Sequence, residues 1–457
     1  MNKSLEILKT QRKYNQNKVR VEFICKSDSV DNFTLWYEFD KEYDTFLTDE
    51  RCDAAVVALI FPAMRAGFKQ ISSKIPMSEK LYYNLKYQVI PNLVNSNPGI
   101  FRIDLDIPTT PVVWHGPLVV TGMSRGVDSF ATYVEYFKEC KLDRYRLNAF
   151  TYFQVGAHHG YDVPLGHGKE SNQELYDNQL KQTKEFCNKY GLRLINVATN
   201  IDQVLNMRSM FMERGFDKSH TSRNCSVVML LQKLISIYYY SSAYQLFDFM
   251  PKLNIDMAHY DKWLLPLLNT GSTEFYQSNQ DWTRLQKVQK IAKYPECQDY
   301  LQVCLIKSGN CGYCTKCKRT LIELDSMGED VLNSFGKSFD LDDYKQNYRK
   351  KWFSEILVEK DKPNGEAHFF DEAFVNAYYH HPEILGDLLP IKNPNISKVV
   401  LKDKVNIRDL PSLLSNILSV GSKGDTFTYL GEGGAWVGIQ NEKHQKAFVK
   451  KSFVDLI

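Results

Sequence analysis

Residues 119–136, VVTGMSRGVDSFATYVEY, join two kinds of local structure through a short polar turn. Apolar residues lead into a run with two serines, a glycine and an aspartate, and an amphipathic pattern begins directly afterwards. Backbone N–H groups at the start of a helix are unpaired donors with partial positive charge, and small residues let an anion approach them. The stretch therefore predicts a buried strand, an anion-binding turn and a helix.

Strands and helices alternate on the carboxyl side of this turn. Such alternation indicates βαβ units, a parallel sheet and helices on both faces of that sheet. The predicted strands are LVVTG (118–122), NAFTYFQVG (148–156) and LRLINVATN (192–200), and the predicted helices are VDSFATYVEYFKEC (127–140), SNQELYDNQLKQTKEFCNKYG (171–191) and a segment from about residue 225 to 244.

The segments on either side of this α/β region have different patterns. Residues 1–110 mix short alternating stretches with one helix near DAAVVALIFPAMRAGFKQ and indicate a small α+β domain. Three prolines predict a linker near 107–117. The α/β domain would then span 117–325. A C-terminal α+β region would span 326–457, with FFDEAFVNAYYHH helical and FTYLGEGGAWVGI forming two strands around a structural glycine turn.

Composition excludes several classes of protein. The 457 residues are 43% hydrophobic with a net charge of +3, which does not support a dominant nucleic-acid or polybasic membrane role. The N-terminal stretch lacks the apolar core of a signal peptide, and the most apolar runs are too short to span a bilayer. Four of the ten cysteines lie within fourteen residues, which is typical of a metal site in a reducing compartment. We therefore expect a cytoplasmic protein that does not bind membranes, and no direct binding of nucleic acid.

The polar turn supplies candidate ligands for phosphate oxygens. Serine hydroxyls can donate to these oxygens, whereas a carboxylate would hold the loop or a Mg²⁺ ion. The run is neither a Walker A motif nor a dinucleotide fingerprint. The alternative is an ordinary strand–turn–helix in which Ser and Asp cap the helix. The candidates are Ser124, Arg125, Gly126, Asp128 and Ser129.

This turn resembles the PP-loop, S-G-G-x-D-S, of the ATP pyrophosphatases. The departure is Arg125, which stands where the pattern has glycine. If the backbone there needs a positive φ, arginine is strained. If it does not, the guanidinium lies beside the pyrophosphate and can bind it bidentately. The sequence leaves both alternatives open.

A second motif, VCLIKSGNCGYCTKCKRT, has the spacing of metal ligands. Its cysteines, spaced C-x6-C-x2-C-x2-C, are Cys304, Cys311, Cys314 and Cys317. Two-residue gaps turn successive thiolates onto one metal, and four thiolates without an open position form a structural zinc site. An iron–sulfur cluster also takes four cysteines. Cys297 is a rival for the fourth ligand.

The two motifs together resemble the 7-cyano-7-deazaguanine synthase (QueC-like) family over residues 117–325. The resemblance implies a Rossmann-like HUP domain, with zinc held by the cluster at 304–317. It also implies ATP-dependent adenylation of the carboxylate of 7-carboxy-7-deazaguanine, followed by conversion of the resulting amide to a nitrile. The chain is about twice the size of the housekeeping enzyme. Long forms of this build resemble those of bacterial anti-phage defence islands and surface-polysaccharide clusters, which suggests transfer of a deazaguanine to a protein encoded nearby.

Further candidates for the nucleotide pocket lie at strand ends and on one basic helix. An ordinary role in capping or on a solvated helix face is the alternative for each. Gln154, His158 and His159 correspond only approximately to the family's Y-G-Q-R-H-like segment. The remaining candidates are Gly156, Thr199 and Asn200 for adenine and ribose, Thr273 and Glu274 for substrate or Mg²⁺, and Arg284 and Lys287 for triphosphate.

The sequence thus predicts an ATP-dependent ligase that acts as a monomer or homodimer. A carboxylate attacks the α-phosphate of ATP, AMP and pyrophosphate are released, and the acyl group passes to ammonia or to a protein amine. Arg125, Asp128 and Ser129 are the candidate catalytic residues. One alternative is sulfur transfer to a nucleobase, which needs a reactive cysteine or an iron–sulfur cluster. A second is a non-catalytic nucleotide-binding component of a defence system, which the departure at Arg125 keeps open.

Overall fold

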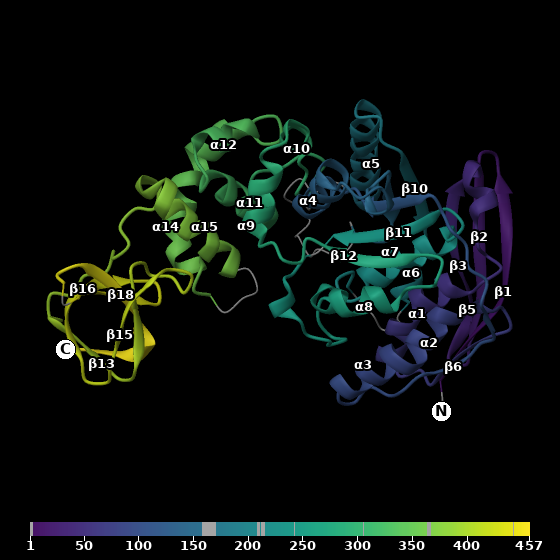
Figure 1. The fold of residues 1–457 in the computed structure, drawn as a ribbon, viewed down its shortest axis with the longest axis horizontal. Coiled ribbons are helices and arrows are strands. Elements are labelled where there is room, and N and C mark those ends of the chain that lie inside the picture. The colour runs from purple at the N-terminus through teal and green to yellow at the C-terminus, as the bar shows by residue number, and fades with distance from the viewer. Residues whose placement is uncertain are drawn as a thin grey trace. The chain divides into compact units, whose positions relative to one another are not determined.

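The chain folds into two compact units in the computed structural model (Figure 1). The structure describes residues 3–157, 171–207, 211, 215–241, 243–304, 306–362, 367–441 and 443–457. The first unit comprises Met1–Thr283 with Leu305–Ser308, and the second comprises Arg284–Cys304 with Gly309–Ile457. The sequence placed domain boundaries near 110 and 325, so the observed division falls elsewhere.

A ten-stranded sheet forms the centre of the first unit, in the order β12-β11-β8-β9-β10-β3-β2-β1-β4-β6. Its strands are β1 (Ser4–Asn15), β2 (Lys18–Ser27), β3 (Val30–Asp40), β4 (Gln70–Ser73), β6 (Asp104–Asp106), β8 (Leu118–Gly122), β9 (Ala149–Gln154), β10 (Leu194–Thr199), β11 (Ile235–Ser241) and β12 (Glu274–Ser278). A separate two-stranded sheet pairs β5 (Met77–Ser78) with β7 (Thr109–Thr110).

The strands from β12 to β10 pair in parallel, as the sequence predicted. Their order is 3-2-1-4-5 when the strands are numbered along this segment of the chain, so β8 lies between β9 and β11. The chain leaves β8 towards one side of the sheet and returns later on the other side. Such a switch point opens a crevice at the carboxyl end of the central strand.

Helices cover both faces of this sheet, with α4 and α5 on one side and α1, α6, α7 and α8 on the other (Figure 1). The helices of the first unit are α1 (Asp53–Arg65), α2 (Glu79–Asn84), α3 (Ile90–Ser96), α4 (Val127–Tyr133), α5 (Asn172–Lys189), α6 (Ile201–Leu205), α7 (His220–Val228) and α8 (Asp261–Leu267). A capping box at Ser171 starts α5, and Gly191, with φ of 64°, follows its end. Across the described ranges, the structure has no helix with the length and apolarity that crossing a membrane would require.

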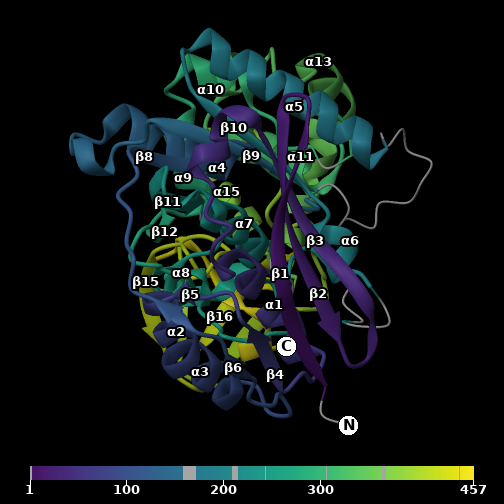
Figure 2. The same cartoon turned by 90° about the vertical axis from the view of Figure 1, so that its right-hand side faces the viewer.

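The N-terminal residues continue the same sheet rather than forming a sheet of their own. Figure 2 shows β1, β2 and β3 side by side as long strands. They form an antiparallel meander, and β3 pairs antiparallel with β10 through Tyr37 and Thr199. The sequence did not indicate this pairing, because edge-to-edge contact between distant strands leaves no local pattern.

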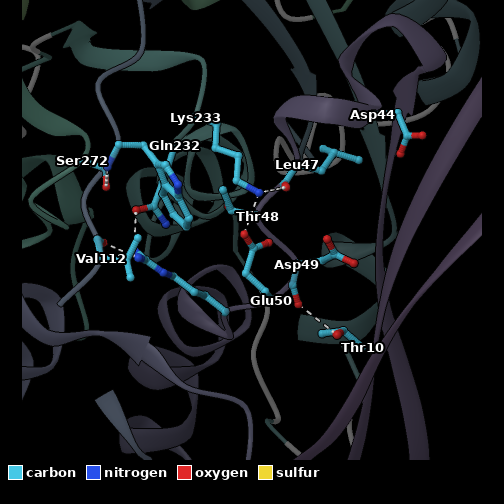
Figure 3. Close-up of polar contacts among 12 residues, drawn as sticks. Thr10, Asp44, Leu47, Thr48, Asp49, Glu50, Val112, Gln232, Lys233 and Ser272 are labelled. Atoms are coloured by element: carbon cyan, nitrogen blue, oxygen red, sulfur yellow. Dashed lines mark hydrogen bonds and ion pairs between the residues drawn. The ribbon is translucent and has the colours of Figure 1, made fainter. Parts of the chain in front are cut away.

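Polar contacts also fix the segment before α1 and the predicted linker near 107–117 to the first unit (Figure 3). Lys233 Nζ lies 2.6 Å from Glu50 Oε1. The Arg51 guanidinium lies 3.9 Å from the centre of the Trp114 ring, and the Trp114 backbone N–H donates to Ser272 Oγ at 3.0 Å. Residues on both sides of the predicted boundary therefore pack as one body.

The helix expected from about residue 225 to 244 is wrong in its second half. The helix α7 ends at Val228, a 3₁₀ turn spans Met229–Leu231, and Ile235–Ser241 forms β11. A continuous apolar run cannot be assigned to helix or strand by periodicity alone. The β-branched and aromatic residues of ISIYYYS favour a strand, and β11 is buried between β8 and β12.

The second unit combines helices with a seven-stranded antiparallel sheet of order β15-β14-β18-β17-β16-β13-β19. Its helices are α9 (Arg284–Ile291), α10 (Pro295–Tyr300), α11 (Thr315–Asp325), α12 (Glu329–Ser334), α13 (Leu341–Asp343), α14 (Arg349–Glu359) and α15 (Ala367–His380). Its strands are β13 (Lys398–Leu401), β14 (Val405–Arg408), β15 (Ile417–Gly421), β16 (Thr426–Gly433), β17 (Trp436–Gln440), β18 (Lys446–Lys450) and β19 (Val454–Leu456). The predicted helix FFDEAFVNAYYHH and the two strands around GEGGAW are confirmed.

The GEGGAW turn has a packing role. A Cβ atom at Gly433 would lie 2.2 Å from the carbonyl oxygen of Leu388, so only glycine allows this close approach. Asp361, just after α14, accepts hydrogen bonds from the Ala435 N–H at 2.9 Å and the Trp436 indole at 3.3 Å. The turn thereby joins the helices of the second unit to its sheet.

A buried polar network links α7 to the segment that begins α8. His220 Nε2 lies 2.9 Å from Asp256 Oδ1, and Thr221 Oγ1 donates to Asp261 Oδ1 at 2.7 Å. Burial raises the pKa of Asp261 from 3.8 to about 7, although His220 acts in the opposite direction. Burial lowers the pKa of His220, but the hydrogen bond to Asp256 together with the negative charges of Asp256, Asp261 and Asp217 leaves that pKa raised above 6.5.

Both shifts predict that the folded protein loses stability as pH rises. Between the unfolded and folded pKa values of Asp261, the unfolded state is ionised while the folded state keeps its proton, so the free energy of unfolding falls. The contribution of His220 is present below pH 6.5 and is lost as pH rises through its higher folded pKa. We expect the Asp261 shift to lower Tm as pH rises from about 4 to about 7, and this fall to be smaller in Asp261→Asn, whose amide resembles the protonated carboxyl.

Thermal denaturation followed by circular dichroism across this pH range tests the expectation. Asp143→Asn, at an exposed position in the turn after α4, is the matched control. Its Tm should change with pH as the wild-type Tm does. An unchanged slope in Asp261→Asn would assign the pH dependence to other groups.

Candidate functional site

The polar turn lies at the switch point of the parallel sheet. β8 ends at Gly122, and the chain enters α4 through the N-cap residue Gly126, whose φ of −75° and ψ of 171° are extended. This N-cap makes no side-chain hydrogen bond to the first helical turn. The helix continues without a break as a π-helical turn, Val134–Glu139. The N-cap is glycine, so the N-cap residue itself supplies no capping side chain.

Arg125 has the left-handed backbone that glycine favours. Its φ is 61°, a conformation that costs a non-glycine residue about 1–2 kcal/mol. The side chain is 3% exposed, and its guanidinium donates to Thr183 Oγ1 at 3.1 Å and to Gln182 Oε1 at 2.8 Å. The backbone at Arg125 therefore has a positive φ, and the first alternative, in which arginine is strained there, holds. The guanidinium faces α5, so the expectation that it lies beside a pyrophosphate is corrected, and an anion on this turn would meet Arg125 through its backbone.

The two serines of the turn hold its shape. Ser124 Oγ accepts from the Gly126 N–H at 3.3 Å and donates to Ser129 Oγ at 3.2 Å. Ser129 Oγ donates to the Gly126 carbonyl at 3.0 Å. Asp128, in the first turn of α4, is half-buried. The structure thus brings all five candidate residues of the turn together.

A polar cluster that the sequence did not indicate lies on the same edge of the sheet. Thr132 Oγ1, on α4, lies 2.6 Å from Ser278 Oγ and 3.0 Å from Ser241 Oγ. It also lies 3.1 Å from Asn279 Oδ1, and the Asn279 amide bonds Glu135. Ser241 and Ser278 end β11 and β12, so a correct assignment of β11 as a strand would have indicated them.

The predicted strand-end ligands have structural roles. Gly156 has a φ of 100°, and a Cβ atom there would lie 2.5 Å from Asp202 Oδ1. Thr199 Oγ1 donates to the Trp36 carbonyl at 2.6 Å. Asn200 Oδ1 accepts from the Trp36 N–H, and its Nδ2 donates to the carbonyl of Thr34, both at 2.8 Å. The polar atoms of Thr199 and Asn200 therefore join β10 to β3.

Two further candidates lie at the opposite edge of the sheet from the turn. Thr273 immediately precedes β12 and Glu274 begins it, whereas the polar turn follows the carboxyl end of the parallel strand β8. Thr273 Oγ1 donates to the Ile235 carbonyl at 2.6 Å, and Glu274 Oε2 accepts from the Tyr276 hydroxyl at 2.6 Å. These contacts correct the expectation that they orient substrate or Mg²⁺.

The other pocket candidates fall in three different places. Gln154 Nε2 donates to Gln173 Oε1 at 3.1 Å. His158 and His159 lie outside the described residues. Arg284 and Lys287 belong to α9 of the second unit, where Arg284 Nε lies 3.4 Å from the buried Glu323 carboxylate and the Lys287 side chain is buried. The side chains of Arg284 and Lys287 therefore do not form the solvated helix face that was the alternative to binding triphosphate.

The four predicted metal ligands converge in the second unit. The sulfur atoms of Cys304, Cys311, Cys314 and Cys317 all lie within 4.8 Å of one another. Cys314 is the N-cap of α11, Cys317 lies in its first turn, and the Cys311 and Cys317 sulfurs are 3.9 Å apart. Four thiolates around one zinc at about 2.3 Å would lie about 3.8 Å apart. The spacing therefore fits a single ion of this size, and these cysteines could bind a metal such as zinc.

Asn310 organises the loop that carries these ligands. Its Oδ1 accepts from the N–H groups of Val303 and Cys304 at 2.8 and 3.1 Å. Its Nδ2 donates to the carbonyls of Leu301 and Ser338, each at 2.8 Å. All four hydrogen-bonding positions of the amide are used. This side chain holds the Cys304 segment against the loop before Cys311.

The chemistry of the cluster also fits a cation. Hydrogen bonds from the neighbouring thiols, Cys304 first, raise the pKa of Cys311 well above its usual range. A bound divalent cation would supply the opposing charge that lets the thiols ionise. Cys297, the rival ligand, is buried in α10 and is not part of the group.

Comparisons of the chain with protein-family models, curated proteins and solved structures found no match. The observed fold is mixed α/β, with a large, mostly parallel sheet and a separate antiparallel sheet. The interpretation of the polar turn and of the cysteine cluster therefore depends on their residues and geometry.

The cluster predicts about one tightly bound zinc per chain, which elemental analysis of the purified protein would detect. We expect Cys311→Ser to lose most of this metal and to lower Tm, because the ion joins Cys304 to α11. Cys297→Ser is the matched control and should keep the metal. Iron with inorganic sulfide in place of zinc, or zinc loss only in Cys297→Ser, would contradict the assignment.

Proposed function

We propose that the chain is an ATP-dependent ligase of the PP-loop class that adenylates a small carboxylate. The observation that carries the proposal is the left-handed backbone of Arg125 in the turn after β8. The S-G-G-x-D-S pattern has glycine at this position, and a glycine-like conformation is what such a loop would need. The agreement links the residue pattern to a backbone shape.

The position of the turn supports the same proposal. The 3-2-1-4-5 order places it at a switch point, where open parallel sheets bind their ligands. This order is also the one expected for the Rossmann-like HUP arrangement that we propose. N–H groups at the start of α4 and the hydroxyls of Ser124 and Ser129 are donors suited to phosphate oxygens.

The proposed reaction has two steps. The substrate carboxylate attacks the α-phosphate of ATP, and the bond from this phosphorus to the oxygen of the leaving pyrophosphate breaks. An amine then attacks the carbonyl of the acyl-adenylate, loses a proton and displaces AMP. The turn between Gly122 and α4 would bind the pyrophosphate and stabilise the charge that grows on it. Mg²⁺ would neutralise phosphate charge when bound, and Asp128 is the residue proposed to hold it.

The proposed substrate rests on the resemblance to the 7-cyano-7-deazaguanine synthase family. The PP-loop-like turn and the cysteine cluster together suggest 7-carboxy-7-deazaguanine or a related carboxylate, with ammonia or a protein amine as acceptor. The cysteine cluster would stabilise the fold of the second unit, since four thiolates leave a zinc ion no open position for substrate.

Sulfur transfer is less well supported than adenylation alone. Such chemistry needs a cysteine that ionises readily. Cys187, on α5, is the cysteine whose ionisation the charge of Arg125 assists, yet burial raises its pKa to about 12. A thiol in this environment is a packing residue and a poor nucleophile.

Incubation with ATP, Mg²⁺ and 7-carboxy-7-deazaguanine should yield AMP and pyrophosphate, measured by chromatography. Asp128→Ala should lower this turnover by about 100-fold, a loss typical of groups that stabilise transition-state charge. Arg125→Gly should keep turnover, because glycine adopts the left-handed backbone without strain.

Asp143→Ala, at an exposed site outside the turn, is the control and should behave like the wild type. Release of ADP and phosphate would contradict adenylation. Nucleotide binding without AMP release, in the presence of neighbouring gene products and ammonia, would favour a non-catalytic role.

A further inference from the structure

The antiparallel sheet of the second unit carries a groove that the proposed ligase chemistry does not use. Its volume is about 530 Å³. It lies over β14, β15 and β18 and over the segments that adjoin them. The residues that line it are Lys404, Val405, Asn406, Arg408, Leu413, Val420, Trp436, Lys450 and Phe453.

The polar lining of this groove has one sign of charge. Lys404, Arg408 and Lys450 are cationic, and among the described residues no acidic side chain lines the groove. Lys404, Asn406 and Arg408 alternate along the chain from the residue before β14, so they share one face of the sheet. Side chains on one face of a strand are spaced about 6.7 Å apart, which is also the repeat of an extended peptide. The groove therefore complements carboxylates presented at every second residue.

The neighbouring edge of the sheet is open and apolar. β15 is the last strand of the sheet order, and within the described part of the chain it pairs with β14 alone. Ile417 and Val420 are each 51% exposed, and Leu418 is 44% exposed. Natural edge strands are usually blunted by lysine, proline or an inward-pointing charge, and the sequence ILSVG of β15 has none of these. Val420 lies opposite Asn406 in the ladder, so the groove and this edge are continuous.

We propose that the groove and the β15 edge bind an extended segment of a partner protein in which carboxylate and apolar side chains alternate. The segment pairs with β15 as an additional strand, and backbone hydrogen bonds supply part of its affinity. Its carboxylates lie on the face of the sheet that carries the positive charges of Lys404, Arg408 and Lys450. Its apolar side chains lie on the opposite face, which carries Ile407 of the core.

Charge and side-chain type select this occupant over two others. A second copy of the chain would bring the same three cations of the groove against one another, because a two-fold contact places one patch on both sides. Single-stranded nucleic acid binds by stacking its bases on aromatic rings. Phe453 is the one exposed aromatic side chain in the described lining of the groove, since Trp436 is only 1% exposed, and the exposed side chains of β15 are aliphatic.

The probe for a test is a fluorescein-labelled ten-residue peptide of alternating Glu and Val, titrated with the full chain and followed by anisotropy. We expect saturable binding that Lys404→Glu/Lys450→Glu weakens by about tenfold or more. Val420→Lys, which places a charge on the edge strand, should weaken it as well. Hydrogen exchange of the backbone amides at 417–421 should slow when the peptide binds.

Matched controls make each result decisive. Lys398→Glu/Lys443→Glu changes the net charge equally at exposed sites outside the groove and should leave binding unchanged. The proposal is overturned if a Lys/Val peptide binds as well as the Glu/Val peptide or if the Glu/Val peptide does not bind. It is also overturned if both double variants weaken binding equally. Tighter binding of a ten-nucleotide thymidine strand would assign the groove to nucleic acid. A dimer of the free chain that Val420→Lys dissociates would assign it to a second copy. Both of these outcomes also exclude the proposal.

Discussion

The position of β8 between β9 and β11 determines where the first unit can bind a ligand. Residues on both neighbours pair with this strand, Phe150 on one side and Tyr239 on the other, each opposite Thr121. The chain therefore leaves the sheet in one direction after β8 and joins it again on the other side after α7. Open parallel sheets generally bind their ligands at the carboxyl edge of such a switch point. The polar turn and the hydroxyl groups that end β11 and β12 lie at this edge because of the strand order.

Within this frame, the shape of the turn depends on an unusual residue. A left-handed backbone at a non-glycine residue needs compensation from its surroundings. Arg125 obtains it by burying its guanidinium against α5, where Thr183 and Gln182 accept its hydrogen bonds. The same backbone shape that glycine would adopt through flexibility is here imposed by a side chain. The turn and α5 are consequently coupled, and a displacement of α5 would disturb the donors of the turn.

Local patterns predicted the parts of the fold that depend on local physics. The β8–α4 turn, the helix α5 and the four clustered cysteines are short-range signals, and the structure contains each of them. Long-range features were not predictable in this way. The pairing of β3 with β10 engages Thr199 and Asn200, which a strand-end pattern alone had marked as ligands. The exclusion of Cys297 from the metal group likewise needed the three-dimensional position of α10.

The second unit shows why basic residues near a candidate motif are weak evidence for a ligand. Arg284 follows the parallel sheet directly in sequence, yet its guanidinium lies against Glu323 and Thr320 on α11. The helix α11 begins at the cysteine cluster, and a metal there would fix its first turn. Asn310 already holds the loop through hydrogen bonds that need no metal, so binding would lock an arrangement that is largely formed. The ion pair of Arg284 with Glu323 lies near the end of α11, and the cysteine ligands lie at its start. The ion pair accounts for the burial of the Arg284 guanidinium without a bound nucleotide.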